Sequence, residues 1–287
     1  MRKHGPVGVI AFFIITLVLV FAAACGQENL GPEAEMPYYG EAGDLQAIRE
    51  RGCLLVGATG DYQPMSWLDP ETGEYTGFDA ALAEDLAESL GVDLIYVPTS
   101  WPTLMEDTLA GKFDLAVCGI TVTEDRKEQA LMSEGYLGNG KTILVRGEDA
   151  EKYTGLESID RPEVRVMVNP GGLNERFARE NLPDATLIVH AVNQEIPALI
   201  AEGEADVMIT EIMEAGYYVG QDSRLAAPLI DEPFTQGQLG VLMPKDAEEL
   251  LAYVNAFLER EKDSGRIDEL AQTYIYQHIV PQLDEAA

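Results

Sequence analysis

The sequence predicts an α/β protein of two lobes that close on each other like a clamshell, each lobe being a mainly parallel sheet flanked by helices. The first observation behind this prediction is that short apolar runs alternate with amphipathic helical patterns, which is typical of parallel sheets. The second is that this alternation occurs twice along the 287 residues. The third is that an extended segment follows each occurrence, so the chain crosses between the lobes twice and forms a hinge.

The N-terminal residues 1–25 have the features of a lipoprotein signal peptide. A basic start precedes an apolar run at 7–21, and small residues lead to Cys25. This order is typical of secretory signals, and the segment "AAAC" resembles a bacterial lipobox, in which the cysteine is lipidated after cleavage. The apolar run is short for a membrane-spanning helix, which makes an uncleaved anchor the weaker alternative. Residues 26–43 are a polar tether, so we expect an exported, periplasmic or cell-surface protein that touches the membrane only through a lipid anchor on Cys25.

The first lobe is expected to comprise residues 44–142 and 237–287. Its first helix, "GFDAALAEDLAESLG", places leucines on one face and ends in Gly91, a residue type that often terminates helices. Asp79 in this segment is interpreted as a helix N-terminal residue rather than a catalytic one. The expected elements are a strand at 53–60, a helix at 77–91, a strand at 92–98, a helix at 100–112, a strand at 113–119 and a C-terminal helix at 247–265.

The second lobe, residues 143–236, repeats the same rhythm. Its expected elements are a strand at 164–170, a helix at 173–182, a strand at 185–192, a helix at 195–204 and a strand at 205–210. The two crossing segments are expected at 140–149 and 235–246.

The charge and the cysteines narrow the classes of partner. Asp and Glu number 50 against 19 Lys and Arg, for a formal charge of -31. Such a surface repels nucleic acid, so no nucleic-acid partner is expected, and any anion site must be built from local donors. Cys53 precedes the first strand and Cys118 ends a parallel neighbour, so we expect no disulfide between them. Without CxxC, HExxH or clustered histidines, no metal or other cofactor is expected.

Polar and aromatic side chains follow the strands of the first lobe. Asp61 and Tyr62 come after the first strand, Thr99 and Trp101 after the second, and Arg126 after the third. Ligands of open parallel sheets bind at the carboxyl ends of the strands, so we expect these residues to bind a ligand in the interlobe cleft. Arginine suits a carboxylate because of its bidentate geometry. The alternatives are that Arg126 pairs with Glu124 or Glu128 on the surface and that Trp101 belongs to the core.

The second lobe and the hinge add further candidates. The stretch "VMVNPGGLNERFAREN" joins a strand, a glycine turn and a helix N-terminus, where backbone N–H groups can bind an anion. Asn169, Gly171 and Gly172 lie in that turn, and Lys141 lies at the hinge with either a cleft or a solvated role. His190, after the next strand, is expected to be a hydrogen-bonded core or rim residue.

Glu211 and Glu214 form the most informative pair. At a spacing of i, i+3 we expect them to share one helix face and to raise each other's pKa. A carboxylic acid with a raised pKa can donate a proton near neutral pH. The alternative is a solvated acidic helix start, which the helix macrodipole favours.

The clamshell, the stretch "GFD", the stretch "LAGKFD" and the threonine-rich loop before Arg126 resemble the periplasmic amino-acid-binding proteins of ABC importers, which have the type II periplasmic-binding fold. Within that family, the stretches "TGDYQPMSW", "PTSWPTLMED", "VNPGGLNERFAREN", "IVHAVN" and "TEIMEA" are most similar to cyclohexadienyl dehydratases. The resemblance implies that Glu214 is the general acid. It also implies that Arg126, Lys141, Asn169 and the Gly171–Gly172 turn hold the substrate and that Trp101 shapes the pocket.

Two functions follow from the resemblance. The first is an enzyme that removes water and carbon dioxide from prephenate or arogenate, small anionic cyclohexadienyl compounds. The second is a lipid-anchored receptor that delivers an amino acid or carboxylate to an ABC permease. Glycine in the turn, and Glu211 at the position where amino-acid receptors carry an aspartate for the ligand amine, fit the first function better.

Overall fold

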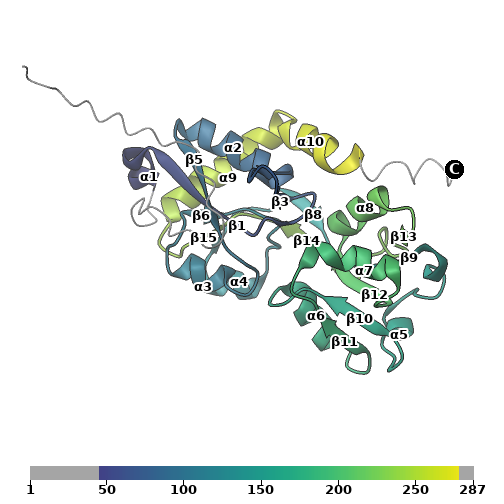
Figure 1. The fold of residues 1–287 in the computed structure, drawn as a ribbon. Helices are drawn as coiled ribbons and strands as arrows, with labels where there is room; N and C mark the ends of the chain where they lie inside the picture. The colour runs from purple at the N-terminus through teal and green to yellow at the C-terminus, as the bar shows by residue number, and fades with distance from the viewer. Residues whose placement is uncertain (1–44, 278–287) are drawn as a thin grey trace, which may run out of the picture.

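The computed structural model describes residues 45–277 and has the two-lobe α/β architecture that the sequence predicts (Figure 1). The expected signal peptide (1–25), its Cys25 and the tether (26–43) lie outside the described residues. Each lobe is built around a five-stranded sheet with helices on both faces. Among the helices of residues 45–277, none is long and apolar enough to cross a membrane.

The sheet of the first lobe has the strand order β5-β1-β6-β15-β7, and β1 is parallel to both β5 and β6. Alternate residues of β1 serve opposite faces: Leu54 and Val56 pack with α2, α9 and α10, whereas Cys53 and Leu55 pack on the other face with Leu104 of α3. The strands are β1 (Cys53–Ala58), β5 (Asp93–Pro98), β6 (Leu115–Ala116), β7 (Leu131–Met132) and β15 (Leu242–Met243). The helices are α1 (Leu45–Arg51), α2 (Phe78–Leu90), α3 (Leu104–Leu109), α4 (Glu124–Gln129), α9 (Glu248–Asp263) and α10 (Arg266–Ala271), followed by a π-helical turn at Gln272–Tyr276.

The sheet of the second lobe has the order β11-β10-β12-β9-β13, with β10 parallel to β11 and β12. Val166 and Val168 face the core under α5 and α6, and Met167 faces the core under α7 and α8. The strands are β9 (Lys141–Arg146), β10 (Arg165–Val168), β11 (Thr186–Val189), β12 (Val207–Glu211) and β13 (Leu225–Ala226). The helices are α5 (Leu156–Ile159), α6 (Leu173–Asn181), α7 (Ile196–Glu202) and α8 (Ile212–Gln221), with short 3-10 turns at Gly147–Asp149 and Asn193–Glu195.

The two crossing segments form strands that pair with each other and with the sheets of both lobes. β8 (Leu137–Asn139) and β14 (Gly237–Leu239) pair antiparallel between the lobes. Beyond this pair, β9 enters the second sheet antiparallel to β12, and β15 enters the first sheet antiparallel to β6. Each sheet is therefore mixed, because a chain that returns from the other lobe enters the sheet against the direction of its parallel strands.

The expected strand at 113–119 is reduced to Leu115–Ala116 because the chain turns toward the cleft beyond it. There the N–H of Gly119 donates to the carboxylate of Asp79. Asp79 lies in the first turn of α2, as expected, but it is fully buried and also accepts a hydrogen bond from the Tyr136 hydroxyl at 2.7 Å. Burial raises the pKa of Asp79 to about 7, although both donors favour its charged form.

Cys53 and Cys118 are both buried and are not joined by a disulfide. A small sheet of β2 (Asp61–Tyr62), β3 (Ser66–Leu68) and β4 (Tyr75–Thr76), which the sequence pattern did not predict, connects β1 to α2.

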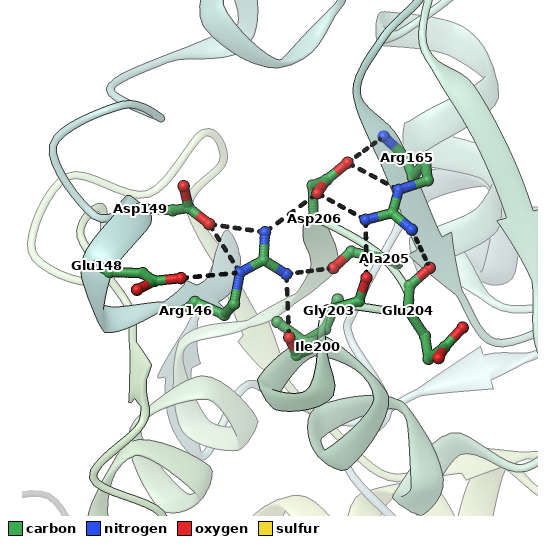
Figure 2. A network of polar contacts seen from close by, with 9 residues as sticks. All are labelled: Arg146, Glu148, Asp149, Arg165, Ile200, Gly203, Glu204, Ala205 and Asp206. Carbon is green, nitrogen blue, oxygen red and sulfur yellow. Dashed lines mark hydrogen bonds and ion pairs between the residues drawn. The ribbon is translucent and has the colours of Figure 1, made fainter.

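The end of the second sheet at the start of β10 and β12 is held together by the polar network in Figure 2, in which Arg146 and Arg165 share Asp206. Arg146 Nη2 lies 3.0 Å and Arg165 Nη2 lies 2.9 Å from Asp206 Oδ1. Partial burial raises the pKa of Asp206, but the arginines outweigh it and lower the pKa to about 2. This network ties β9, β10 and the entry to β12 together at the end of the sheet where its parallel strands begin.

Candidate active site between the lobes

The carboxyl ends of the parallel strands of both sheets meet at one cavity between the lobes. Tyr62, Trp101 and Arg126 reach it from the first lobe, Glu214 from the second, and Lys141 from the start of β9. About 360 Å³ of empty space lies among its lining residues, and this figure includes space open to solvent. Its lining residues are Tyr62, Trp101, Gly119, Thr121, Arg126, Lys141, Asn169, Gly172, Leu173, Asn174, Asn193, Glu211 and Glu214.

Glu211, the last residue of β12, is the centre of a buried polar network. Its Oε1 lies 2.7 Å from Lys141 Nζ and accepts a hydrogen bond from Thr121 Oγ1 at 2.8 Å. Its Oε2 accepts hydrogen bonds from Tyr62 OH and Asn139 Nδ2, both at 2.8 Å. Burial alone would raise the pKa of Glu211, but the charge of Lys141 and these donors outweigh it and hold the pKa below its usual value. Glu211 is therefore a carboxylate.

Lys141 is buried with its partner, and its Nζ also donates to Asn174 Oδ1 at 2.6 Å. Burial lowers the pKa of Lys141, while Glu211 opposes that change. Of the two roles considered for Lys141, solvated or in the cleft, the structure has the second.

Glu214 has the opposite environment. It lies in the first turn of α8 and is only 2% exposed. Its Oε1 accepts a hydrogen bond from Asn193 Nδ2 at 2.7 Å, and its Oε2 accepts one from the Thr210 hydroxyl. Burial raises the pKa of Glu214 to about 8 against these two donors, with support from the negative charges of Asp61 and Glu211. A carboxyl group in this state keeps its proton near neutral pH.

The sequence-based expectation for this pair was wrong about the shared helix face and right about only one of the two pKa values. Glu211 ends a strand and caps α8, so it does not share a helix face with Glu214. The pKa effect is also one-sided: the charge of Glu211 contributes to the raised pKa of Glu214, as expected, whereas the pKa of Glu211 is lowered by Lys141 and its hydrogen-bond donors. The alternative of a solvated helix start is equally wrong, since both side chains are buried.

The lobes touch each other across this cavity. Besides the bonds from Tyr62 and Thr121 to Glu211, Asn193 Nδ2 donates to the backbone oxygen of Asp61 at 3.0 Å. Arg176 of α6 forms an exposed ion pair with Asp125 of α4 at the mouth. The structure therefore has the two lobes closed on each other.

Arg126 lies in α4 and is 9% exposed. Its Nη1 donates to the backbone oxygen of Thr121 at 2.6 Å. Among residues 45–277, no carboxylate forms an ion pair with it, and Glu124 pairs with Lys127 instead. The surface pairing considered from the sequence is therefore absent from the described part of the chain, and guanidinium donors remain for the cavity.

Of the three predicted residues in the glycine turn, Asn169 and Gly172 line the cavity and Gly171 does not. Gly171 has φ 75°, and an added Cβ would lie 2.6 Å from the Cα of Pro102 in the first lobe. Its N–H donates to Glu175 Oε2 at 2.7 Å, and Gly171 does not line the cavity. Its role is to let the two lobes approach each other closely at Pro102. Gly172 and Asn169 line the cavity, and Asn169 Oδ1 accepts a hydrogen bond from Asn174.

The aromatic wall consists of Tyr62 and Trp101, whose rings meet edge to face with centroids 6.1 Å apart. Trp101 Nε1 donates to Asp61 Oδ1 at 3.0 Å. Burial raises the pKa of Asp61 although Trp101 and other donors act against it. Asp61 does not line the cavity; it supports the residues that do.

Thr99 is not brought to the cavity, in contrast to the prediction. Its hydroxyl donates to Asp107 Oδ2 at 2.6 Å, at the start of α3. His190 is a rim residue as expected, with Nε2 2.7 Å from Glu195 Oε2.

The sequence reasoning did not select Asn139, Asn174 and Asn193 as site residues. Their positions in the sequence gave a weak indication, because each is an asparagine beside a strand end, a hinge strand or the glycine turn. An amide side chain at such a position can both donate and accept hydrogen bonds.

Among known proteins, this chain is similar in sequence to a dehydratase and to amino-acid-binding proteins. The chain is 40% identical over 247 residues, which is 86% of this chain and 90% of the relative, to a cyclohexadienyl dehydratase of Pseudomonas aeruginosa. It is 25% identical to the ABC transporter glutamine-binding protein GlnH of Bacillus subtilis, over 96% of this chain and 98% of the relative.

The solved structures that resemble this chain are also of an amino-acid-binding protein and a dehydratase. An ancestral amino-acid-binding protein described as a precursor of cyclohexadienyl dehydratase matches with a TM-score of 0.74 and 36% identity, over 80% of this chain and 98% of that one. An ancestral cyclohexadienyl dehydratase matches with a TM-score of 0.51 and 50% identity, over 83% of this chain and 99% of that one. The model of the bacterial extracellular solute-binding proteins, family 3, matches residues 54–277. The expected resemblance is confirmed, and the chain belongs to the bacterial extracellular solute-binding proteins of family 3.

Proposed function

We propose that this protein is a cyclohexadienyl dehydratase, which converts prephenate to phenylpyruvate and arogenate to phenylalanine in the interlobe cavity. The observation that carries this proposal is Glu214, a cavity-lining carboxyl group whose pKa burial raises to about 8. The same cavity holds the cationic side chains of Lys141 and Arg126. One wall can therefore deliver a proton while other walls hold carboxylates.

The proposed reaction needs only these parts. Glu214 gives its proton to the ring hydroxyl, the carbon–oxygen bond breaks, and water leaves. The bond between the ring and its carboxylate then breaks, its electron pair completes the aromatic ring, and carbon dioxide leaves. Glu214 regains a proton from solvent. Because aromatisation drives the reaction, one positioned acid and firmly held carboxylates are a sufficient set.

The remaining lining residues have proposed roles in binding. Arg126 offers a bidentate partner to one carboxylate. Asn169 and Gly172, beside the N-terminus of α6, offer donors to the other. Tyr62 and Trp101 form the wall against which the ring lies. Closure of the lobes keeps water from the reacting group.

The ion pair between Lys141 and Glu211 argues against an amino-acid receptor. A receptor needs a carboxylate that is available for the ligand's ammonium group. Glu211 is the residue at the expected position, but Lys141 Nζ lies 2.7 Å from its Oε1 and three further side chains donate to it. Its lone pairs are therefore already engaged. The dehydratase of Pseudomonas aeruginosa, at 40% identity, is also more similar to this chain than the ancestral amino-acid-binding protein at 36% and the glutamine- and cystine-binding proteins at 25–27%.

The experiment that tests the proposal is to mix the purified protein with prephenate and to follow the absorbance of phenylpyruvate. A parallel reaction with arogenate is followed by the appearance of phenylalanine. Catalysed formation of either product supports the proposal. Tight binding of an amino acid, with neither prephenate nor arogenate converted, would contradict it and favour delivery of a ligand to an ABC permease.

The family consists of extracellular proteins, which agrees with the expected export of this chain. We further propose that Cys25 is lipidated and holds the protein at the membrane surface, since a small-residue stretch directly precedes this cysteine in the sequence.

A further inference from the structure

Asn193 is a buried polar residue of the cavity that contacts both lobes. It begins the 3-10 turn after β11, is 3% exposed and lines the cavity beside Glu214. Its side chain touches both lobes, because its Nδ2 contacts Asp61 of the first lobe and Glu214 of the second.

The orientation of the Asn193 amide is fixed by its partners. The backbone oxygen of Asp61, 3.0 Å away, can only accept a hydrogen bond, so the atom facing it must be the nitrogen. The same nitrogen donates to Glu214 Oε1 at 2.7 Å. Both amide hydrogens are therefore used, and Oδ1 is the remaining group of this side chain.

Asn193 Oδ1 is a buried acceptor that no donor of residues 45–277 satisfies. A buried polar atom without a partner destabilises a protein, and such atoms in folded proteins usually have a hydrogen-bond partner. Because Asn193 lines the cavity, a ligand in this cavity can supply the donor.

The chemistry of the substrate identifies that donor, if the proposed function is correct. The two carboxylates and the keto group of prephenate are acceptors only, and its single donor is the ring hydroxyl. Arogenate carries the same hydroxyl and has an ammonium group in place of the keto group, so the hydroxyl is the one donor that both substrates share. We propose that Asn193 Oδ1 accepts the hydrogen bond of the hydroxyl group that leaves as water.

This contact would orient the leaving group for Glu214. When the hydroxyl hydrogen points to Asn193, the lone pairs of its oxygen are free to receive the proton of Glu214. Because Asn193 also donates to Glu214 Oε1, one side chain aligns the acid and the group that it protonates. The departing water then contains the hydroxyl oxygen, its original hydrogen and the proton from Glu214.

The test uses two non-reactive analogues of prephenate with a saturated ring, one with the hydroxyl and one with hydrogen in its place. Their dissociation constants are measured by calorimetry for the full-length wild type, for Asn193→Ala and for Asn193→Asp. The wild type should bind the hydroxylated analogue more tightly by roughly 10-fold or more, because the deoxy analogue leaves Oδ1 unsatisfied. In Asn193→Ala this ratio should fall by most of that factor, and what remains reflects the contact of the hydroxyl with Glu214.

Asn193→Asp is the matched variant, because it keeps an oxygen where Oδ1 lies and removes the donor to Asp61 and Glu214. It should bind both analogues more weakly but keep a ratio clearly above one. A purely structural role for Asn193 predicts that Asn193→Ala weakens binding of both analogues by the same factor, and that result would overturn the inference. If the wild type binds neither analogue, the proposed substrate is wrong and the inference fails with it.

Discussion

Replacing Glu214 by glutamine should change how the stability of the protein depends on pH. The pKa of this carboxyl rises from 4.5 to about 8 on folding because the side chain is buried. The folded state therefore holds one more proton than the unfolded state between these values. The free energy of unfolding then falls with rising pH by about 1.4 kcal/mol per pH unit.

Because the folded pKa is raised, the stability linked to Glu214 is fully present below pH 4.5 and is lost as pH rises to about 8. The loss amounts to about 5 kcal/mol at most. Glutamine has the shape of the protonated acid, can still accept from Asn193 and can donate to Thr210, and it does not ionise.

Urea unfolding at pH 5 and pH 9 measures the effect. Between these two conditions, Glu214→Gln should gain several kcal/mol of stability relative to the wild type. Asp79, whose pKa burial raises to about 7, adds its own pH dependence to both proteins, so it cancels in this comparison. Glu124→Gln, at an exposed side chain, serves as the control and should show no such gain. A wild-type-to-variant difference that is equal at both pH values would refute the reasoning, because Glu214 would then be ionised in the folded protein.

Arg126→Ala should weaken binding of a carboxylate ligand by about 2–4 kcal/mol in a calorimetric titration, and unchanged affinity would exclude Arg126 from the site. Gly171→Ala should hinder closure because its Cβ would lie 2.6 Å from Pro102, so small-angle scattering with ligand should give a larger radius of gyration than for the wild type. Gly203→Ala, also at positive φ but away from the lobe contact, is its control and should close normally. Cys25→Ser should release the protein from membranes without changing its ligand affinity, and continued membrane association would point to an uncleaved anchor.

The sequence predicted the parallel parts of both sheets because alternating apolar strands and amphipathic helices are local patterns. β1, β10 and β12 and helices α2 and α6 lie where the periodicity placed them, within a few residues. The antiparallel entry of β9 and β15 could not be predicted in the same way. Whether an extended crossing joins a sheet depends on which edge the other lobe presents, and that is a tertiary property.

Most of the residues predicted from their position after a strand do line the cavity, but that position did not predict which side chains pair with each other. It placed Glu211 and Glu214 near each other, yet the charge of Glu211 depends on Lys141, which is 70 residues away in sequence, and the proton of Glu214 depends on burial. Thr99 also follows a strand but does not line the cavity, because Asp107, one turn into the next helix, takes its hydroxyl. Three-dimensional partners, rather than position at a strand end, decide which polar side chain faces a ligand.

The pH profile of prephenate turnover in the wild type and in Glu214→Gln tests the central claim, that Glu214 delivers the proton to the leaving hydroxyl. In the wild type, kcat/KM should decrease as the pH rises through about 8, where Glu214 loses its proton. Glu214→Gln should still bind the saturated hydroxylated analogue, while its kcat should be lower than that of the wild type by roughly two to four orders of magnitude at pH values below about 8. Wild-type turnover of prephenate by Glu214→Gln would contradict the account.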